Sequence, residues 1–301
     1  MSTRHQGLAR EFALLVLLAT LWGSSYSFIK VAVASIPPLS LMAARTLVAG
    51  AILLAVLHGR GLRLPRDAQT WRQFAVQACL NSVVPFTLIA WGQQTVDASL
   101  ATILNSTSPI FTFLLTALVT RHEPVNGRKL FGVAAGVVGI SLIVGLQALD
   151  GLGRAVWAQL ALVVAAVFYA GAAIFGKSFK GLDPMIPAAG SLLVGAVFLV
   201  PASLLVDRPW TLAPTRDSIM ALLALSIFST ALAFAIYFRL IHTLGSVGTT
   251  AQAYLRVPIG VAIGVLLLGE RLSATAVAGL VCVVAAVVAM TLPAAAAKRT
   301  A

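Results

Sequence analysis

Long apolar runs, separated by short polar or charged segments, recur along almost the whole chain. A run of about 20 residues without charge is long enough to cross the hydrocarbon core of a membrane as a helix. Breaks at proline, glycine and clusters of charge predict helices near 12–35, 38–57, 72–92, 96–119, 127–147, 155–177, 184–206, 217–240, 246–268 and 273–292. The pattern therefore predicts an all-α integral membrane protein with ten transmembrane helices.

The first of these runs also has features of a secretory signal peptide, because Arg4 and Arg10 precede its apolar core. However, the run stays largely apolar through Ala34, which makes it long enough to span a membrane. We therefore interpret it as the first transmembrane helix.

The composition supports a membrane protein and leaves no room for a separate soluble domain. Hydrophobic residues make up 59% of the chain and charged residues 10%, whereas soluble domains have roughly 25% charged residues. The net charge of +12 would suggest a nucleic-acid partner in a soluble protein. Here the Lys and Arg residues lie in short loops between apolar runs, so we expect the lipid bilayer as a partner and no nucleic acid.

The distribution of Lys and Arg predicts the orientation, because basic residues in short loops favour the cytoplasmic side. If both termini are cytoplasmic, 14 basic residues lie on the inner side and 4 on the outer side. We therefore predict that both termini are cytoplasmic.

The chain resembles itself after a spacing of about 147 residues. The matched pairs are Trp22 and Tyr169, Phe28 and Phe175, Lys30 and Lys177, Pro37 and Pro184, Glu123 and Glu270, and Gly132 and Gly279. Lys, Glu and Pro are scarce in this chain, so their coincidence in one register indicates a duplication. Because each copy holds five predicted spans, residues 1–150 and 151–301 would form two inverted five-helix repeats, an architecture that suits transport.

All nine acids fall at the ends of predicted spans or in loops, and the four His residues are also near span ends. This weighs against an ion-driven pump that uses a buried carboxylate. An intramembrane enzyme would need a catalytic pair at depth, such as two acids or Ser with His, and neither is present. No spacing typical of metal ligands occurs, so we predict no enzyme, no metal and no cofactor.

Three basic residues do fall within predicted spans. Lys30 is near the outer end of the first span, where its long side chain can reach the interface. Arg45 lies deeper in the second span and either leans toward the outer surface or bonds to carbonyl groups. Arg256 lies close to the midplane of the ninth span, where it must face water, carbonyl oxygens or a ligand. A substrate carboxylate would match its planar guanidinium group.

Pro85, Pro109 and Pro258 lie near the middles of the third, fourth and ninth spans. Each removes one helical hydrogen bond and frees the carbonyl four residues earlier, at Asn81, Asn105 and Tyr254. These positions either form locally bonded kinks or line a water-filled cavity. The full set of candidate cavity residues is Trp22, Ser24, Tyr26, Gln77, Asn81, Asn105, Tyr169, Gln252, Tyr254 and Arg256.

Several passages resemble the drug/metabolite transporter superfamily, in particular its ten-helix members built from two EamA-type repeats. They are Leu21-Trp22-Gly23-Ser24-Ser25 with Lys30, Pro37-Pro38 with Ala44-Arg45, Ala98 to Ala101 through Ser108-Pro109, Glu123, Val257-Pro258 and Gly269-Glu270-Arg271-Leu272. The resemblance implies a central cavity walled by the first, third, fourth, sixth, eighth and ninth helices. One departure is that Leu192 stands opposite Arg45 in the repeat, so the two halves do not supply a symmetric pair of arginines.

The resemblance also implies export of amino acids or other small metabolites from the bacterial cytoplasm across the inner membrane, most like the exporters of aromatic and other amino acids. We expect alternating access through the central cavity, with the chain as a monomer or weak homodimer. The alternative is a multidrug or nucleoside-type exporter of the same superfamily. An intramembrane enzyme and a purely structural subunit are more remote alternatives.

Overall fold

A computed structural model describes residues 2–96, 98–120, 127–144, 155–256, 258–259 and 274–291. In the first half of the chain the elements are α1 (Ser2–Ala32), α2 (Pro38–Gly59), α3 (Ala68–Ala78), η1 (Cys79–Val83), α4 (Val84–Gly92), α5 (Ala98–Asn105), α6 (Ser108–Leu115), η2 (Thr116–Thr120) and α7 (Gly127–Val144). In the second half they are α8 (Val156–Phe175), η4 (Gly176–Phe179), α9 (Met185–Val206), η5 (Pro209–Thr211), α10 (Arg216–Ser226), η6 (Ile227–Leu232), α11 (Ala233–Thr250) and α13 (Ala274–Thr291). The described residues contain helices and turns but no strand, which confirms the all-α class.

Seven described stretches are long and apolar enough to cross a membrane. They are Ala9–Ala32, Pro38–Gly59, Ala68–Gly92, Leu100–Leu118, Val156–Phe179, Met185–Val206 and Arg216–Thr250. The last stretch breaks at Gly245, whose φ of 75° is not helical, so the predicted eighth span ends there and the ninth begins. Helices α7 and α13 lie at the fifth and tenth predicted spans. Much of the predicted ninth span lies outside the described residues, so the count of ten and the sidedness of the termini stay predictions.

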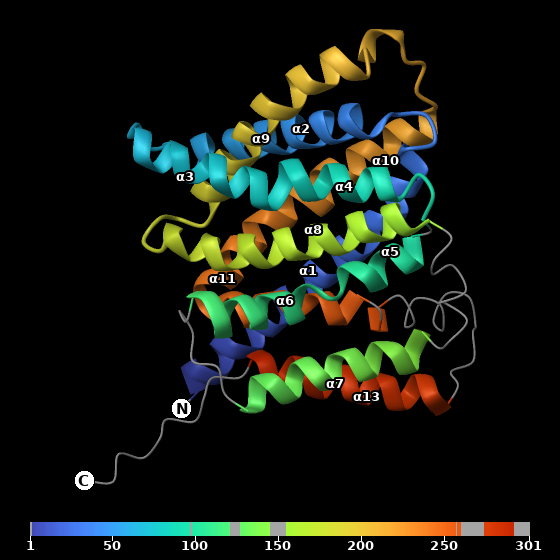
Figure 1. The fold of residues 1–301 in the computed structure, drawn as a ribbon. Helices are drawn as coiled ribbons and strands as arrows, with labels where there is room; N and C mark the ends of the chain where they lie inside the picture. Colours follow the sequence, from blue (N-terminus) through green and yellow to red (C-terminus); the bar gives the residue numbers. More distant parts are fainter. Residues whose placement is uncertain are drawn as a thin grey trace.

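Helices that occupy equivalent places in the two predicted repeats pack against each other. Helix α2 lies beside α9, and α7 lies beside α13 (Figure 1). Helix α1 also packs on α10 and α11, and α8 packs on α4. These contacts all join the first half of the chain to the second, so neither half buries its apolar surface alone.

Small residues allow α7 and α13 to approach closely. A methyl group at Gly132 would lie 2.6 Å from Cγ of Met290, and one at Gly139 would lie 2.8 Å from the carbonyl oxygen of Gly279. Close packing of this kind lets helices associate within a membrane, where lipid is as apolar as the side chains. These glycines of α7 are therefore engaged in contacts within the chain.

Two spans are divided into three parts by a π-helical segment. In one of them η1 separates α3 from α4, and in the other η6 separates α10 from α11. Pro85 lies in the first turn of α4, two residues after η1 ends, and its ring removes a backbone donor at that point. In η6, the Thr230 hydroxyl donates to the carbonyl of Leu225, five residues earlier, at 2.7 Å. A π segment departs from the regular hydrogen-bond spacing of the α-helix, and such segments often occur at functional sites.

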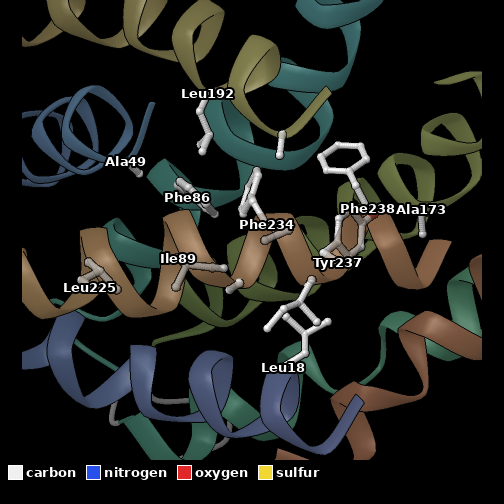
Figure 2. Packing of buried hydrophobic residues seen from close by; sticks show 14 of the residues in the cluster. Leu18, Ala49, Phe86, Ile89, Ala173, Leu192, Leu225, Phe234, Tyr237 and Phe238 are labelled. Atoms are coloured by element: carbon white, nitrogen blue, oxygen red, sulfur yellow. The ribbon is translucent and has the colours of Figure 1, made fainter. Parts of the chain in front are cut away.

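An aromatic cluster fills the space where α4, α9 and α11 face each other. Phe86 and Phe234 point toward one another from facing helices, with ring centroids 6.0 Å apart (Figure 2). Tyr237 and Phe238 continue the cluster along α11, with their centroids 5.2 Å apart. By contrast, many large apolar side chains on the outside of the bundle are exposed, such as Leu205 and Trp157. This outer surface suits lipid. The aromatic cluster lies beside the site described next, because Phe234 and Tyr237 contact Trp22.

Candidate functional site

A small cavity lies where α1, α2, α4, α8 and the helical segment 252–256 converge. Its lining residues are Trp22, Ser25, Tyr26, Ile29, Arg45, Ile89, Tyr169 and Arg256. The centre of a water molecule can occupy about 20 Å³ of it, which is room for about one ordered water. The cavity is therefore too small for a metabolite while the helices are in this arrangement.

Arg256 enters this cavity with its guanidinium group held by three neutral oxygens. Its Nη1 donates to the hydroxyl of Tyr26 at 2.8 Å and to Oδ1 of Asn105 at 3.2 Å. Its Nε donates to Oε1 of Gln252 at 3.2 Å. The side chain is buried, and the guanidinium carbon lies 5.5 Å from the centre of the Trp22 ring. These contacts orient the cation, but none of them neutralises its charge.

Arg45 reaches the same cavity from the second span. Its Nε donates to the hydroxyl of Thr230 at 2.7 Å, and its Nη2 donates to the carbonyl of Ser229 at 3.4 Å. Its guanidinium carbon lies 3.6 Å from the centre of the Phe86 ring, which adds a cation–π contact. Arg45 is 3% exposed, so the prediction that it leans toward the outer surface is wrong, and bonding to a carbonyl is what occurs.

The π segment η6 supplies the acceptors that hold both Arg45 and the cavity wall. The carbonyl of Ser229 accepts from Arg45 and also from Nε1 of Trp22, at 3.1 Å. The indole of Trp22 is stacked on Tyr169, with centroids 6.4 Å apart and planes at 18°. It also contacts Tyr237, at 5.3 Å between centroids. One carbonyl of the π segment thus accepts hydrogen bonds from both a cation and an aromatic ring.

Four of the ten predicted site residues line the cavity, namely Trp22, Tyr26, Tyr169 and Arg256. Asn105 and Gln252 lie behind it and hold Arg256 through hydrogen bonds. Ser106 strengthens this region, because its hydroxyl donates to the carbonyl of Ala253 at 3.0 Å. Asn105 ends α5, and Pro109 lies in the first turn of α6, so the chain changes direction at this point.

The other four predicted site residues lie elsewhere. The hydroxyl of Ser24 bonds back to Leu21 within α1, and Nε2 of Gln77 donates to the carbonyl of Ala172 on α8. Asn81 is buried in η1 without a place in the cavity lining. Tyr254 packs against Gly136 of α7, and its hydroxyl donates to the carbonyl of Val133. Pro258 is described, but its neighbours at 257 and 260 lie outside the described residues.

The cavity also contains residues that the sequence analysis did not select, namely Ser25, Ile29, Arg45 and Ile89. Among these, Arg45 matters most, because it adds the second span to the cavity wall. An arginine in the second apolar run and two adjacent hydroxyl residues in the eighth were visible in the sequence. Only their packing shows that they meet.

Contacts between the halves close the cavity toward both ends of α1. At one end, Nη2 of Arg239 lies 2.6 Å from Oε1 of Glu11, and the Thr243 hydroxyl donates to the same carboxylate at 2.9 Å. At the other end, the Ser35 hydroxyl donates to that of Ser218 at 2.8 Å. Lys30 lies near this second end and donates to the carbonyl of Gln93 at 3.1 Å. The arrangement is therefore occluded around the two arginines.

A second hollow, of about 480 Å³, lies between η1, α6 and the end of α8. Its lining is apolar except for Lys177 and Ser178. A site that recognises a polar metabolite needs several converging polar groups. The smaller cavity with its two arginines meets that requirement better than this larger hollow.

Comparison with known proteins places the chain among membrane transporters. The model of the EamA-like transporter family matches residues 10–145 and again residues 156–292. The uncharacterized inner membrane transporter YedA of Escherichia coli (strain K12) is 28% identical over 291 residues, which cover 96% of this chain and 93% of that protein. The uncharacterized transporter YoaV of Bacillus subtilis (strain 168) is 24% identical, over 81% of this chain and 84% of its own.

One more distant relative has a name that includes a substrate. It is the "Probable terminal-alkyne amino-acid exporter" of Streptantibioticus cattleyicolor, which is 25% identical over 87% of each chain. A solved crystal structure aligns with a TM-score of 0.73 over 93% of this chain and 95% of the other. Its sequence identity of 17% means that this likeness shows the fold alone.

The apolar spans, the occluded cavity between the halves and the two matches to one family description agree with each other. Together the two matches cover nearly the whole chain, and the relatives are named as transporters. The protein is therefore a multi-pass transporter of the inner membrane, and the chain belongs to the EamA-like transporter family.

Proposed function

We propose that this protein exports amino acids or related small metabolites that carry a carboxylate, through the cavity around Arg256. The observation that carries the proposal is a buried guanidinium group whose hydrogen-bond partners in the described residues are all neutral. A cation at such depth is costly unless it is paired or serves a ligand. The planar guanidinium group of an arginine can bind a carboxylate through two parallel hydrogen bonds.

Binding would replace some of the contacts that Arg256 now makes. The carboxylate takes the guanidinium donors that now point to Tyr26 and Asn105, while Gln252 keeps the side chain in place. The stacked rings of Trp22 and Tyr169 offer an apolar face to the rest of the molecule. The relative named as an amino-acid exporter supports amino acids as the first class to test.

Transport follows by alternating access, with one half rocking against the other. Opening toward one side separates Arg239 from Glu11, and opening toward the other separates Ser218 from Ser35. The small volume of the occluded cavity requires such an opening before any metabolite enters. The positive-inside rule orients the helices in the membrane, and net export from the cytoplasm follows the gradient of the substrate.

The test is efflux from proteoliposomes loaded with a panel of labelled amino acids. Arg256→Gln keeps hydrogen-bonding capacity but removes the charge, so we expect efflux to fall by about tenfold or more. Arg63→Gln is the matched control, because Arg63 is exposed in the loop after α2 and should leave efflux unchanged. Full efflux from the Arg256 variant at equal protein level would contradict the proposal.

The same vesicles test the driving force. Of the five acids that the structure describes, four lie at helix ends or in loops, whereas Glu11 is buried in α1, is paired with Arg239 and does not line the cavity. The described lining of the cavity therefore offers no carboxylate for proton coupling. We therefore expect facilitated diffusion or exchange, with efflux insensitive to an imposed pH gradient. A clear acceleration by the gradient would show proton coupling instead.

The alternative is export of drugs or nucleosides, and the aromatic wall of Trp22, Tyr169 and Tyr237 is the observation in its favour. Planar aromatic solutes stack well on such rings. Two buried guanidinium groups, however, repel lipophilic cations. Adding a nucleoside and a cationic dye to the efflux panel separates these possibilities, since either one moving faster than every amino acid would favour the alternative.

A further inference from the structure

Two arginines, rather than one, face the same small cavity. Arg45 is 3% exposed and Arg256 is 6% exposed, and they come from different helices in opposite halves of the chain. Like charges that share a poorly solvated space repel each other strongly, because little water screens them. The occluded cavity therefore carries two positive charges that something must balance.

The described part of the chain does not supply that balance. Its acids are engaged or placed elsewhere: Glu11 pairs with Arg239, Asp67 caps α3, Asp183 accepts from the amide of Met185, Asp207 accepts from Ser40, and Asp217 lies in the first turn of α10. The partners of both cavity arginines are hydroxyls, amides, carbonyls, rings and one thioether sulfur. These groups satisfy donors but leave the net charge of the site unchanged.

Both guanidinium groups also have N–H donors that could bond to a stronger acceptor. Nη2 of Arg256 donates to no residue in the part of the chain that the structure describes. Nη1 of Arg45 reaches only the sulfur of Met42, at 3.7 Å, and its Nη2 makes a long bond of 3.4 Å. A carboxylate or similar oxyanion would form shorter, charge-assisted bonds with these groups.

The scaffold itself does not require a charge at the position of Arg45. Leu192 occupies the equivalent place on α9, where it is fully buried against apolar neighbours. Well-packed apolar residues usually serve stability as well as, or better than, buried charges do. The presence of Arg45 on one side alone therefore points to a ligand rather than to folding.

We infer that the transported substrate carries two acidic groups, one held by Arg256 and the other by Arg45. This inference rests on the proposed function, because it takes the cavity as the transport site. A neutral amino acid would bring one carboxylate and one ammonium group, and the second guanidinium would repel that ammonium. A molecule with two carboxylates balances both cations, while Ile29, Ile89 and the ring of Trp22 enclose the short carbon chain between them.

Pairs of substrates that have nearly the same shape test the inference, in proteoliposomes that contain the full chain. Glutamate against glutamine and aspartate against asparagine differ in the second acidic group alone. We expect the acids to be transported at least about tenfold faster than their amides, in line with the strength of a charge-assisted hydrogen bond. Succinate and glutarate show whether an ammonium group is also needed, since equal transport of glutarate and glutamate would mean that it is not.

Arg45→Leu copies the residue of the other repeat and should fold. We expect it to lose the preference for the acids and to move neutral amino acids faster, because the guanidinium group that repels their ammonium group is gone. It should also lose the thermal stabilisation that glutamate confers on the purified protein. Arg45→Lys keeps the positive charge but loses the planar guanidinium group, so it should retain part of the preference for the acids. Arg63→Gln is again the control and should keep the full preference for the acids over their amides.

The outcomes separate this inference from the proposed function. Amides transported as fast as acids, or an Arg45→Leu protein with full acid preference, would overturn the two-acid substrate while leaving a carboxylate exporter intact. If the Arg45→Leu protein does not fold, the preference of the unaltered chain and of Arg45→Lys decides. If the unaltered chain moves none of these compounds, the proposed function fails as well.

Discussion

The spans α3–η1–α4 and α10–η6–α11 are built alike but are used differently. Each begins with an 11-residue helix whose first turn is capped by a side chain, Asp67 in one and Thr215 in the other. Each then passes through a π segment at the equivalent place, Cys79–Val83 or Ile227–Leu232, before a second α-helix. The duplication thus extends to the local interruption of the helix.

The difference lies in what the neighbouring helix brings to each π segment. Helix α2 brings Arg45 to η6, where Thr230 and the carbonyl of Ser229 accept its hydrogen bonds. Helix α9 packs on η1, but its residue equivalent to Arg45 is the apolar Leu192. In η1, Nδ2 of Asn81 and the hydroxyl of Ser82 are buried without a hydrogen-bond partner in the described residues. A shared scaffold therefore carries a charged site on one side and an apolar contact on the other.

The largest effect on stability is expected from Leu192→Arg, which gives the two equivalent positions, 45 and 192, the same residue. This places a second guanidinium against η1, where the orphaned group of Asn81 is itself a donor. We expect the free energy of unfolding to fall by about 3 kcal/mol, the cost of an arginine deep in a membrane helix. Unfolding of the purified protein in mixed micelles measures this, and an unchanged stability would mean that η1 can hold a guanidinium as η6 does.

A smaller effect is expected when matching hydroxyls are removed from the two π segments. Thr230→Val deletes the acceptor of the short bond from Arg45, so it should lower the free energy of unfolding by about 2 kcal/mol. Ser82→Ala deletes a hydroxyl that has no hydrogen-bond partner in the described residues and should be nearly neutral. The same unfolding assay compares both, and equal losses would show that the two segments are used alike after all.

The smallest effect concerns the caps, of which only one can titrate. The backbone amide of Thr70 donates to Asp67 and lowers the pKa of this carboxyl, which lies in the loop before α3. The contribution of the ionised cap is therefore complete above the pKa of the unfolded chain, about 3.9, and is lost as the pH falls through the lower folded pKa. Thr215 has no such dependence.

Amide hydrogen exchange, corrected for intrinsic rates, follows both caps between neutral pH and about pH 3, a range that includes the carboxyl titration. Protection of the Thr70 amide should weaken on acidification, while that of the Ser218 amide, which donates to Thr215, should hold. Asp67→Asn retains a capping side chain and should remove the pH dependence. Parallel behaviour of the two amides in the unaltered chain would argue against the titrating cap.

Much of the fold could be predicted because it depends on local properties. The spans follow from the length of uncharged apolar runs, and the break near Gly245 follows from the freedom of glycine to adopt a positive φ. Arg256 was a candidate because of the cost of a lone cation at its depth, and the structure does place it in the cavity. The π segment η6 contains no proline, so its position had no comparable local signal.

The composition of the site was harder to predict, because a helix presents its side chains to several neighbours. Gln77 and Asn81 share the face of Pro85 in the sequence, yet Gln77 bonds to α8 and neither residue lines the cavity. Tyr254 lies two residues before Arg256 but packs toward α7. Arg45 was expected to reach the surface or a carbonyl, and the carbonyl it reaches belongs to a residue 184 positions away.

The sequence by itself determined that this protein is a helical membrane protein with an internal repeat, because hydrophobic length and scarce matched residues are properties of the chain alone. The tertiary structure decided that Arg45 joins Arg256 at one cavity and that η6, rather than η1, holds it. The physical reason is that burial and hydrogen bonding of a charged side chain depend on which distant helix packs against it. The charge of the site is therefore a property of the packing between the two halves.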